Sequence, residues 1–364
     1  MKEQTSSRGR QFLLYEGEPT IEARYRVKDI AQLRTLLQEA VELEHFTIPP
    51  YLSALYSIRE GSNQEAAQII RSVVMEEMLH MVLAANVLNA VGGEPCINHP
   101  KFIPNYPAKL PVIDEEFVVN LAPFSQDAIK TFVQIERPSK PSAQPKGSSR
   151  IGDFHTIGQF YEGIELGLKE LSAGGNIFRG NPSRQITPEH YYGGGGKVTV
   201  VTDLDSALNA LNEIVGQGEG VHHTIWTGDD EFGPGFTEVA HFFRFKEILA
   251  RRRYQAGDKF NSDPSGERFQ VCWEEIYPMH ENPKVAKYPE GSEVRQKATI
   301  FNQTYMSVLN ELQAATNGEP SRLMASVPIM YELKYQAVEL MKIPIGDGNR
   351  TAGPSFEYCA ESRI

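Results

Sequence analysis

Cysteine is scarce in this sequence, with three residues among 364. Cys96, Cys272 and Cys359 lie far apart and form no Cys-x-x-Cys pair. A disulfide framework requires an even number of closely spaced cysteines, and a thiolate metal site requires cysteine pairs. The sequence therefore suggests neither a disulfide framework nor a thiolate metal site, and it fits a reducing compartment.

Basic residues and long apolar runs are also lacking. The chain has 36 lysines and arginines against 47 aspartates and glutamates, a net charge of -11, whereas phosphate-binding surfaces concentrate lysine and arginine. Residues 1–20 contain no apolar run of signal-peptide length, and no later stretch approaches the roughly 18 apolar residues of a membrane-spanning helix. We therefore expect a cytoplasmic protein that binds small molecules, and neither nucleic acid nor a membrane.

Apolar residues recur with helical spacing over most of the chain. Pro49 and Pro50 predict a kink or a brief break in the first helix. The prolines and short apolar pieces of residues 94–150 are typical of a long crossover or lid. Helical spacing covers about residues 27–59, 63–91, 156–171, 203–215, 236–253, 294–316 and 320–341.

These segments predict a mainly α fold, a helical bundle with long loop insertions and additional C-terminal helices. We place the bundle at residues 1–255, with the crossover or lid inserted at about 94–150. Residues 256–364 would form a helical extension that packs on the bundle, so that the chain makes one compact unit.

Four Glu-x-x-His sequences mark a candidate metal site. A dinuclear site in a bundle core needs an inward Glu from each of two helices and a Glu-x-x-His from each of two others, because residues three apart point the same way. About one match is expected by chance in a sequence with nine histidines. The matches are Glu42/His45, Glu77/His80, Glu219/His222 and Glu238/His241.

The helical face on which each residue lies separates these matches. Glu77 and His80 fall within the apolar stripe of the second helix, where a carboxylate is costly unless a metal or partner satisfies it. Glu44 lies on the inner face of the first helix, whereas Glu42 projects about 120° away from it toward solvent. Glu44 and Glu77 lie at about the same distance from the turn between the two helices, so an antiparallel hairpin places them side by side. We therefore predict Glu44 as a ligand and interpret Glu42/His45 as a coincidence.

The second half of the site is predicted around Glu238 and His241, in the first turns of a later helix. A glutamate at the same height in the bundle must come from the end of the preceding helix, where the segment GQGEG contains Glu219. The glycines there end the helix and loosen its geometry. On the rival helix, Glu165 borders the apolar face and Glu162 points largely away from it. Glu219 therefore ranks first, with Glu165 and Glu162 as alternates.

The sequence around these residues resembles a known family, the ferritin-like domain associated with the iminophenylpyruvate dimer synthases of violacein- and rebeccamycin-type indole alkaloid pathways. The resemblance covers nearly the whole chain and implies a standalone ferritin-like bundle and a metal-dependent oxidative enzyme. It rests on VELEHFTIPPYLSALYSI, EEMLHMVLAANVLNAVGGEP, TIGQFYEGI, GQGEG and EVAHFFRFKEI, and on the later stretch from YPMHENPKVAKYPEGS through MYELKYQAVELMKIP to TAGPSFEY. The metal ligands that it implies are Glu44, Glu77, His80, Glu219, Glu238 and His241.

Carboxylate and imidazole ligands suit iron or manganese. We expect two iron ions, with manganese as the other candidate. The expected function is a non-haem oxidoreductase that uses oxygen or peroxide to oxidise a small, amino-acid-derived metabolite in a biosynthetic pathway. The alternatives are a ferroxidase or iron-handling protein, and a non-catalytic, metal-stiffened partner of a biosynthetic complex. A homo-oligomer or a pathway-enzyme partner is compatible with each of them.

Overall fold

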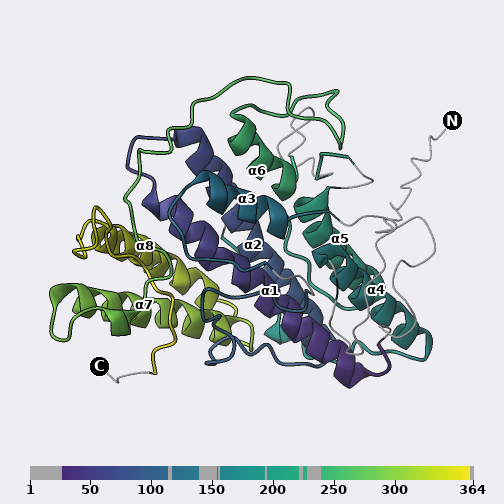
Figure 1. Ribbon diagram of the computed structural model, residues 1–364. Helices are drawn as coiled ribbons and strands as arrows, with labels where there is room; N and C mark the ends of the chain where they lie inside the picture. The colour runs from purple at the N-terminus through teal and green to yellow at the C-terminus, as the bar shows by residue number, and fades with distance from the viewer. Residues whose placement is uncertain are drawn as a thin grey trace.

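The computed structural model describes residues 27–113, 117–138, 154, 156–192, 195–220, 224–227 and 239–360. These residues fold into helices joined by loops, and β-structure among them is confined to isolated bridges (Figure 1). The mainly α class predicted from the sequence is confirmed. The main helices are α1 (Ile30–Ser57), α2 (Gln64–Ala90), α3 (Gln126–Ile135), α4 (Ile157–Ala173), α5 (Leu204–Glu219), α6 (His241–Ala250), α7 (Glu293–Ala315) and α8 (Arg322–Met341).

Helices α1 and α2 form a hairpin through the middle of the molecule, and their contact is the most extensive between any two described helices (Figure 1). Asp29 caps α1 by accepting a hydrogen bond from the amide of Gln32. Gly61, with φ +82°, lets the chain reverse before α2 begins. Buried residues occupy most positions of α2, because other helices cover it on several sides. The hairpin is therefore the scaffold from which inward side chains project.

Two prolines lie inside α1, and the helix continues through Pro49 and Pro50 without a break. Pro50 has no N–H to donate to the carbonyl of Phe46, four residues earlier. The hydroxyl of Tyr106 donates to that carbonyl instead, at 2.6 Å. A tertiary hydrogen bond thus replaces a lost backbone one, and α1 carries inward side chains on both sides of the prolines.

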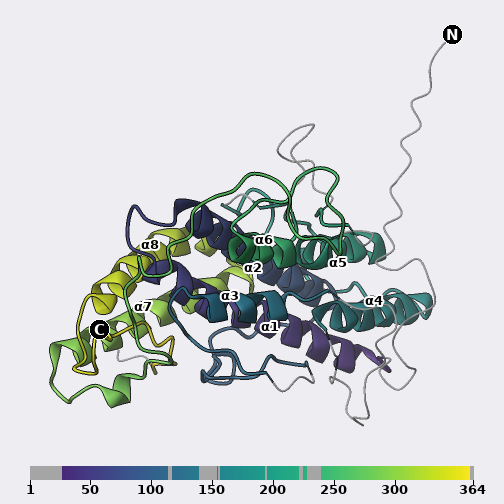
Figure 2. The ribbon, with the colours of Figure 1, turned by 45° about the horizontal axis from the view of Figure 1, so that its top comes forward.

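The remaining helices cover the hairpin in two sets. Helices α3 and α6 pack against each other, as do α4 and α5, and α4, α5 and α6 also contact α1 or α2. Helices α7 and α8 pair with each other, and α8 contacts α1. Figures 1 and 2 both place α7 and α8 on the side of the hairpin away from α4 and α5. The hairpin therefore has one face toward α3–α6 and another toward α7–α8.

Helix α3 lies inside the segment for which the sequence predicted only a crossover or lid. Ser125 caps it by accepting from the amide of Ala128, and the buried Ile129 and Phe132 face the interior. A helix of 10 residues between proline-rich segments gives too short a periodic pattern to recognise, which is why the prediction missed it. The closing role of residues 94–150 and the boundary at residue 255 stay predictions.

Helix α5 is longer than the sequence predicted. The glycines of GQGEG were expected to end it, but Gly216 and Gly218 lie within the helix, which ends at Gly220 with φ +88°. A Cβ at Gly220 would lie 2.4 Å from the carbonyl oxygen of Thr224, so only glycine fits there. The extra turn holds the side chain of Gln217 beside α2, where it contacts His80.

Helix α2 meets the length and composition criteria of a membrane span, because an 18-residue window reaches a mean hydropathy of 1.2. From the sequence we expected no stretch that approaches a membrane-spanning helix. In the folded protein 89% of that window is buried inside the molecule. A buried core helix satisfies the same criteria, so this window is weak evidence for a membrane.

Candidate metal centre

Five buried side chains from four helices converge inside the bundle. Helix α1 contributes Glu44, and α2 contributes Glu77 and His80. Glu136 directly follows α3, and His241 is the first residue of α6. Their exposed fractions lie between 0% and 6%. The α1–α2 register and the packing of α3 against α6 bring them together across long distances in the sequence.

Glu77 belongs to two groups of three candidate ligands, with the ligand atoms of each group within 4.8 Å of one another. In the first group, His80 Nδ1 lies 3.3 Å from Glu44 Oε2 and 4.0 Å from Glu77 Oε1. In the second, His241 Nδ1 lies 2.9 Å from Glu77 Oε1 and 3.6 Å from Glu136 Oε2. Each group could hold a metal ion, and a carboxylate common to both is placed to bridge two ions.

Each of the three carboxylates has one oxygen engaged by a hydroxyl group and the other directed at a histidine nitrogen. A hydroxyl donor fixes the rotation of a carboxylate and leaves the second oxygen available as a ligand. The same division of the two oxygens occurs three times, which indicates a preorganised cluster. The donors are Thr47 to Glu77 Oε2 at 2.9 Å, Tyr51 to Glu136 Oε1, and Tyr161 to Glu44 Oε1.

The tautomer of His80 is determined by Gln217. His80 Nε2 lies 2.8 Å from the side-chain oxygen of Gln217. The amide nitrogen of Gln217 donates to the carbonyl of Gly195 at 2.7 Å and to Glu213 Oε1 at 3.0 Å, so the amide orientation is determined by two acceptors. Nε2 of His80 must therefore carry a hydrogen, and its Nδ1 faces the carboxylates as the ligand atom.

A buried ion pair between Arg244 and Glu76 determines the tautomer of His241. Arg244 donates to both oxygens of Glu76, at 2.8 and 3.0 Å, and Glu76 Oε2 lies 2.7 Å from His241 Nε2. Because Glu76 can only accept, His241 Nε2 carries the hydrogen. Its Nδ1 is buried and has no hydrogen bond of acceptable geometry to a described residue. A metal ion at Nδ1 would satisfy this atom and complete a carboxylate–histidine–metal arrangement.

The electrostatics of the cluster also favour a cation. Burial, together with the charge of Glu136, raises the pKa of Glu77 to about 7. Burial lowers the pKa of His80, but its hydrogen bond to Glu44 outweighs this and raises the pKa overall. The pKa of His241 is raised well above its usual value, because Glu136 and Glu76 outweigh its burial. These raised pKa values favour the protonated forms of the three groups, and metal ions bound there would compete with those protons. The residues present therefore fit a metal ion.

Glu219, predicted as the sixth ligand, lies at the edge of the cluster. It lines a cavity of about 20 Å³ together with Glu44, Glu77 and Glu136. Its Oε1 accepts a hydrogen bond from the amide of Gly158, at 2.9 Å. It belongs to neither group of three, so the structure brings it close but engages it with the start of α4.

The other predicted residues lie in different places. Glu162 and Glu165 are both buried on α4, and neither belongs to the two groups. Glu165 pairs with Lys169, one turn along the same helix. Glu238 lies outside the described residues. Glu42, rejected as a ligand, is half-buried and accepts a hydrogen bond from Gln38.

Glu136 was not predicted from the sequence. It follows Ile129 and Phe132 at helical spacings of seven and four, so it shares their inward face. Ser125 and the apolar positions of α3 were a detectable signal, but the surrounding prolines concealed it. The supporting Gln217 and Glu76 were also missed, because a residue that contacts a ligand through a hydrogen bond has no spacing signature of its own.

Two relatives of known name resemble this chain. Dichlorochromopyrrolate synthase of Lentzea aerocolonigenes is 28% identical over 330 residues, which cover 78% of this chain and 29% of that protein. The 2-imino-3-(indol-3-yl)propanoate dimerase of Chromobacterium violaceum is 26% identical, over 100% of this chain and 38% of that protein. The chain therefore spans less than two fifths of the length of either relative.

The fold also has a counterpart among crystal structures. A ferritin-like protein from Caulobacter vibrioides superposes with a TM-score of 0.60 at 22% identity, covering 90% of this chain and 99% of that one. This likeness concerns the fold alone. The sequence profile of the ferritin-like family matches residues 37–250, more than half of the chain and all five converging side chains. The chain belongs to the ferritin-like family.

Proposed function

We propose that the five converging side chains form a dinuclear metal centre. Glu44 and His80 would hold one ion, Glu136 and His241 the other, and Glu77 would bridge the two. The observation that carries this proposal is the membership of Glu77 in both groups of three, with each histidine locked so that Nδ1 faces the carboxylates. Glu219 and Glu238 stay candidates for additional ligands.

Iron is the metal that we propose, with manganese as the alternative. Hard carboxylate oxygens with one imidazole per ion suit both metals, and availability and geometry decide between them. A buried pair of such ions would supply electrons to oxygen or peroxide. The protein's own residues hold the ions, fix the orientation of each carboxylate and exclude bulk water from the cluster.

We propose that the protein is a non-haem oxidoreductase that uses oxygen or peroxide to oxidise a small, amino-acid-derived metabolite. Two lines of support are the cluster and the names of the relatives, a synthase and a dimerase that acts on an indolyl imino acid. The cavity beside the cluster, about 20 Å³, has room for a molecule the size of water or oxygen. An organic substrate is larger than this cavity and would need its walls to move apart in order to reach the cluster there.

Metal analysis and oxygen uptake test this proposal together. The protein, purified from iron-replete cells, should contain two ions per chain, with anomalous diffraction at the iron edge beside Glu77. Given a reductant, it should consume oxygen faster when a suitable amino-acid-derived substrate is added. Absence of metal near Glu77 and His80 would disprove the centre. Oxidation of added ferrous iron without any effect of organic substrates would instead favour the iron-handling function.

The location and the partners of the protein are also proposals, based on its composition and on its relatives. We propose a cytoplasmic location and a small-molecule substrate, and a homo-oligomer or a pathway enzyme as the macromolecular partner. A metal-loaded protein that never consumes oxygen but binds such an enzyme would show a non-catalytic role. Fractionation and pull-down with the metal-loaded chain are the measurements.

A further inference from the structure

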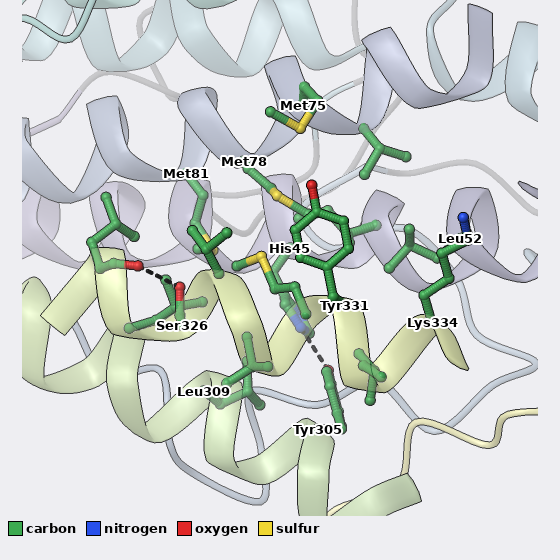
Figure 3. A pocket seen from close by; sticks show the side chains of 18 of the residues that line it. His45, Leu52, Met75, Met78, Met81, Tyr305, Leu309, Ser326, Tyr331 and Lys334 are labelled. Carbon is green, nitrogen blue, oxygen red and sulfur yellow. Dashed lines mark hydrogen bonds between the residues drawn. The ribbon is translucent and has the colours of Figure 1, made fainter. Parts of the chain in front are cut away.

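A second cavity lies on the face of the α1–α2 hairpin that is turned toward α7 and α8. Its volume is about 490 Å³, within the range of roughly 300–1,000 Å³ that small-molecule sites occupy. Figure 3 shows side chains from α1, α2, α7 and α8 gathered around it. The cavity beside the metal cluster, at about 20 Å³, is far smaller. The larger cavity therefore has room for an organic molecule, which the smaller one lacks.

The walls of this cavity are apolar and rich in methionine. Met75, Met78 and Met81 of α2 line it, as do Met330 and Tyr331 of α8. Methionine side chains are unbranched and polarisable, so they adapt to ligands of different shape. The lining therefore suits a flexible or flat apolar body, and its methionines do not impose a single shape.

Charge is confined to two basic residues. Arg71 and Lys334 are the charged residues among the described lining residues, and no described aspartate or glutamate lines the cavity. Both are exposed, and neither forms an ion pair with a described residue. In a protein with a net charge of -11, two unpaired cations beside an apolar cavity indicate an anionic ligand group.

One buried polar atom lies deeper in the wall. His45 is 3% exposed, and its Nε2 contacts the hydroxyl of Tyr305 at 2.6 Å (Figure 3). Its Nδ1 is buried and has no hydrogen-bond partner among the residues that the structure describes. A buried ring nitrogen without a partner is unfavourable, and a ligand with a polar atom would relieve that cost. His45 lines the cavity and thus offers a further point of recognition besides the two basic residues.

We propose that this cavity binds an amphipathic monocarboxylate, with the apolar body among the methionines and the carboxylate at Arg71 and Lys334. A fatty acid and an indole carboxylate share this chemistry. The site is independent of the proposed metal centre. Glu44 and His45 are neighbours on α1 but serve opposite faces of the hairpin, as Glu77 and Met78 do on α2.

Calorimetric titration with two probes tests the site. Decanoate represents the fatty acids and indole-3-propionate the aromatic acids, and the amide of each serves as its neutral counterpart. Saturable binding of one molecule per chain is expected for at least one acid, with weaker binding of its amide. The acid that binds identifies the source of the ligand. Failure of both acids to bind, or equal binding of acid and amide, would overturn the proposal.

Matched variants locate the binding. Met330→Trp fills the cavity and should weaken binding at least about tenfold. Met324→Trp is the control, since Met324 is exposed on the same helix and does not line the cavity. Should Met330→Trp unfold, Val327→Trp fills the same space from another position. Undiminished binding by a folded cavity-filling variant would place the ligand elsewhere and reject the site.

Charge variants complete the test. Lys334→Gln and Arg71→Gln should each weaken binding of the acid about threefold and leave binding of the amide unchanged. Lys342→Gln, at an exposed lysine at the end of α8, should have no effect. Glu77→Gln should also leave binding unchanged, which separates this result from the fate of the metal proposal. A dimer that Met330→Trp dissociates, without ligand binding, would show that a second copy covers the cavity and would contradict the proposal.

Discussion

The two faces of the α1–α2 hairpin differ in how their polar groups are held. Toward α3–α6, every carboxylate and imidazole of the cluster is oriented by a buried neighbour, and the adjoining cavity is about 20 Å³. Toward α7–α8, a cavity of about 490 Å³ has methionine-rich walls, and His45 Nδ1 in its lining has no hydrogen-bond partner in the described part of the chain. A rigid, charged face suits metal ions of fixed geometry, whereas an adaptable apolar face suits an organic molecule. One pair of helices thus separates a buried polar cluster from an apolar cavity.

The largest effect that this comparison predicts comes from the bridging residue. Glu77→Ala should remove both ions, because Glu77 belongs to both groups of ligands, and oxidase activity should fall below detection. Glu136→Ala should remove mainly one ion. Metal content per folded chain is the measurement. Glu42→Gln is the matched control and should retain both ions, whereas full metal content in Glu77→Ala would disprove the bridge.

Removal of the side chain that orients His80 should have the next largest effect on metal binding. Gln217→Leu removes the acceptor that determines the tautomer of His80. Loss of such a partner typically lowers metal affinity about 10–100-fold. Competition with a chelator would measure the affinity of each ion. The ion held by His241 should be affected less, so equal weakening of both ions would contradict the assignment of Gln217 to one half of the centre.

Removal of a single hydroxyl group beside the cluster should have a smaller effect. Tyr161→Phe leaves one oxygen of the buried Glu44 without its donor, which should cost about 1–3 kcal/mol of stability in the protein without metal. Thermal or denaturant unfolding measures this change. Tyr305→Phe is the counterpart on the other face, where the hydroxyl contacts His45. Tyr161→Phe should also weaken metal binding and Tyr305→Phe should not, and a reversed result would break the comparison.

The smallest effect is expected at the wall of the larger cavity. Met330 is half-buried beside open space, so Met330→Ala should change the free energy of unfolding by less than about 1 kcal/mol. Leu83→Ala, in the fully buried core of α2, should cost about 2–5 kcal/mol. Denaturant titration compares the two. Similar costs would mean that the cavity wall is packed as tightly as the core.

Much of the candidate site was predictable because helical periodicity is a local property. Glu44, Glu77 and His80 lie on long helices whose apolar stripes define an inner face, and the structure brings them together there. His241 was predicted from Glu-x-x-His spacing and also joins the cluster. Glu136 could not be ranked in this way, because its helix is short and its neighbours are prolines.

The sequence by itself determined the mainly α class, the ferritin-like family and the inward face of α1 and α2. These features depend on spacing within single helices, where each turn repeats the same geometry. Only the tertiary structure decided that Glu136 joins the cluster while Glu219 contacts Gly158. It also decided that the far face of the hairpin encloses a cavity. Both outcomes depend on how helices that are distant in the sequence pack against each other. The spacing of residues within one helix carries no information about such packing.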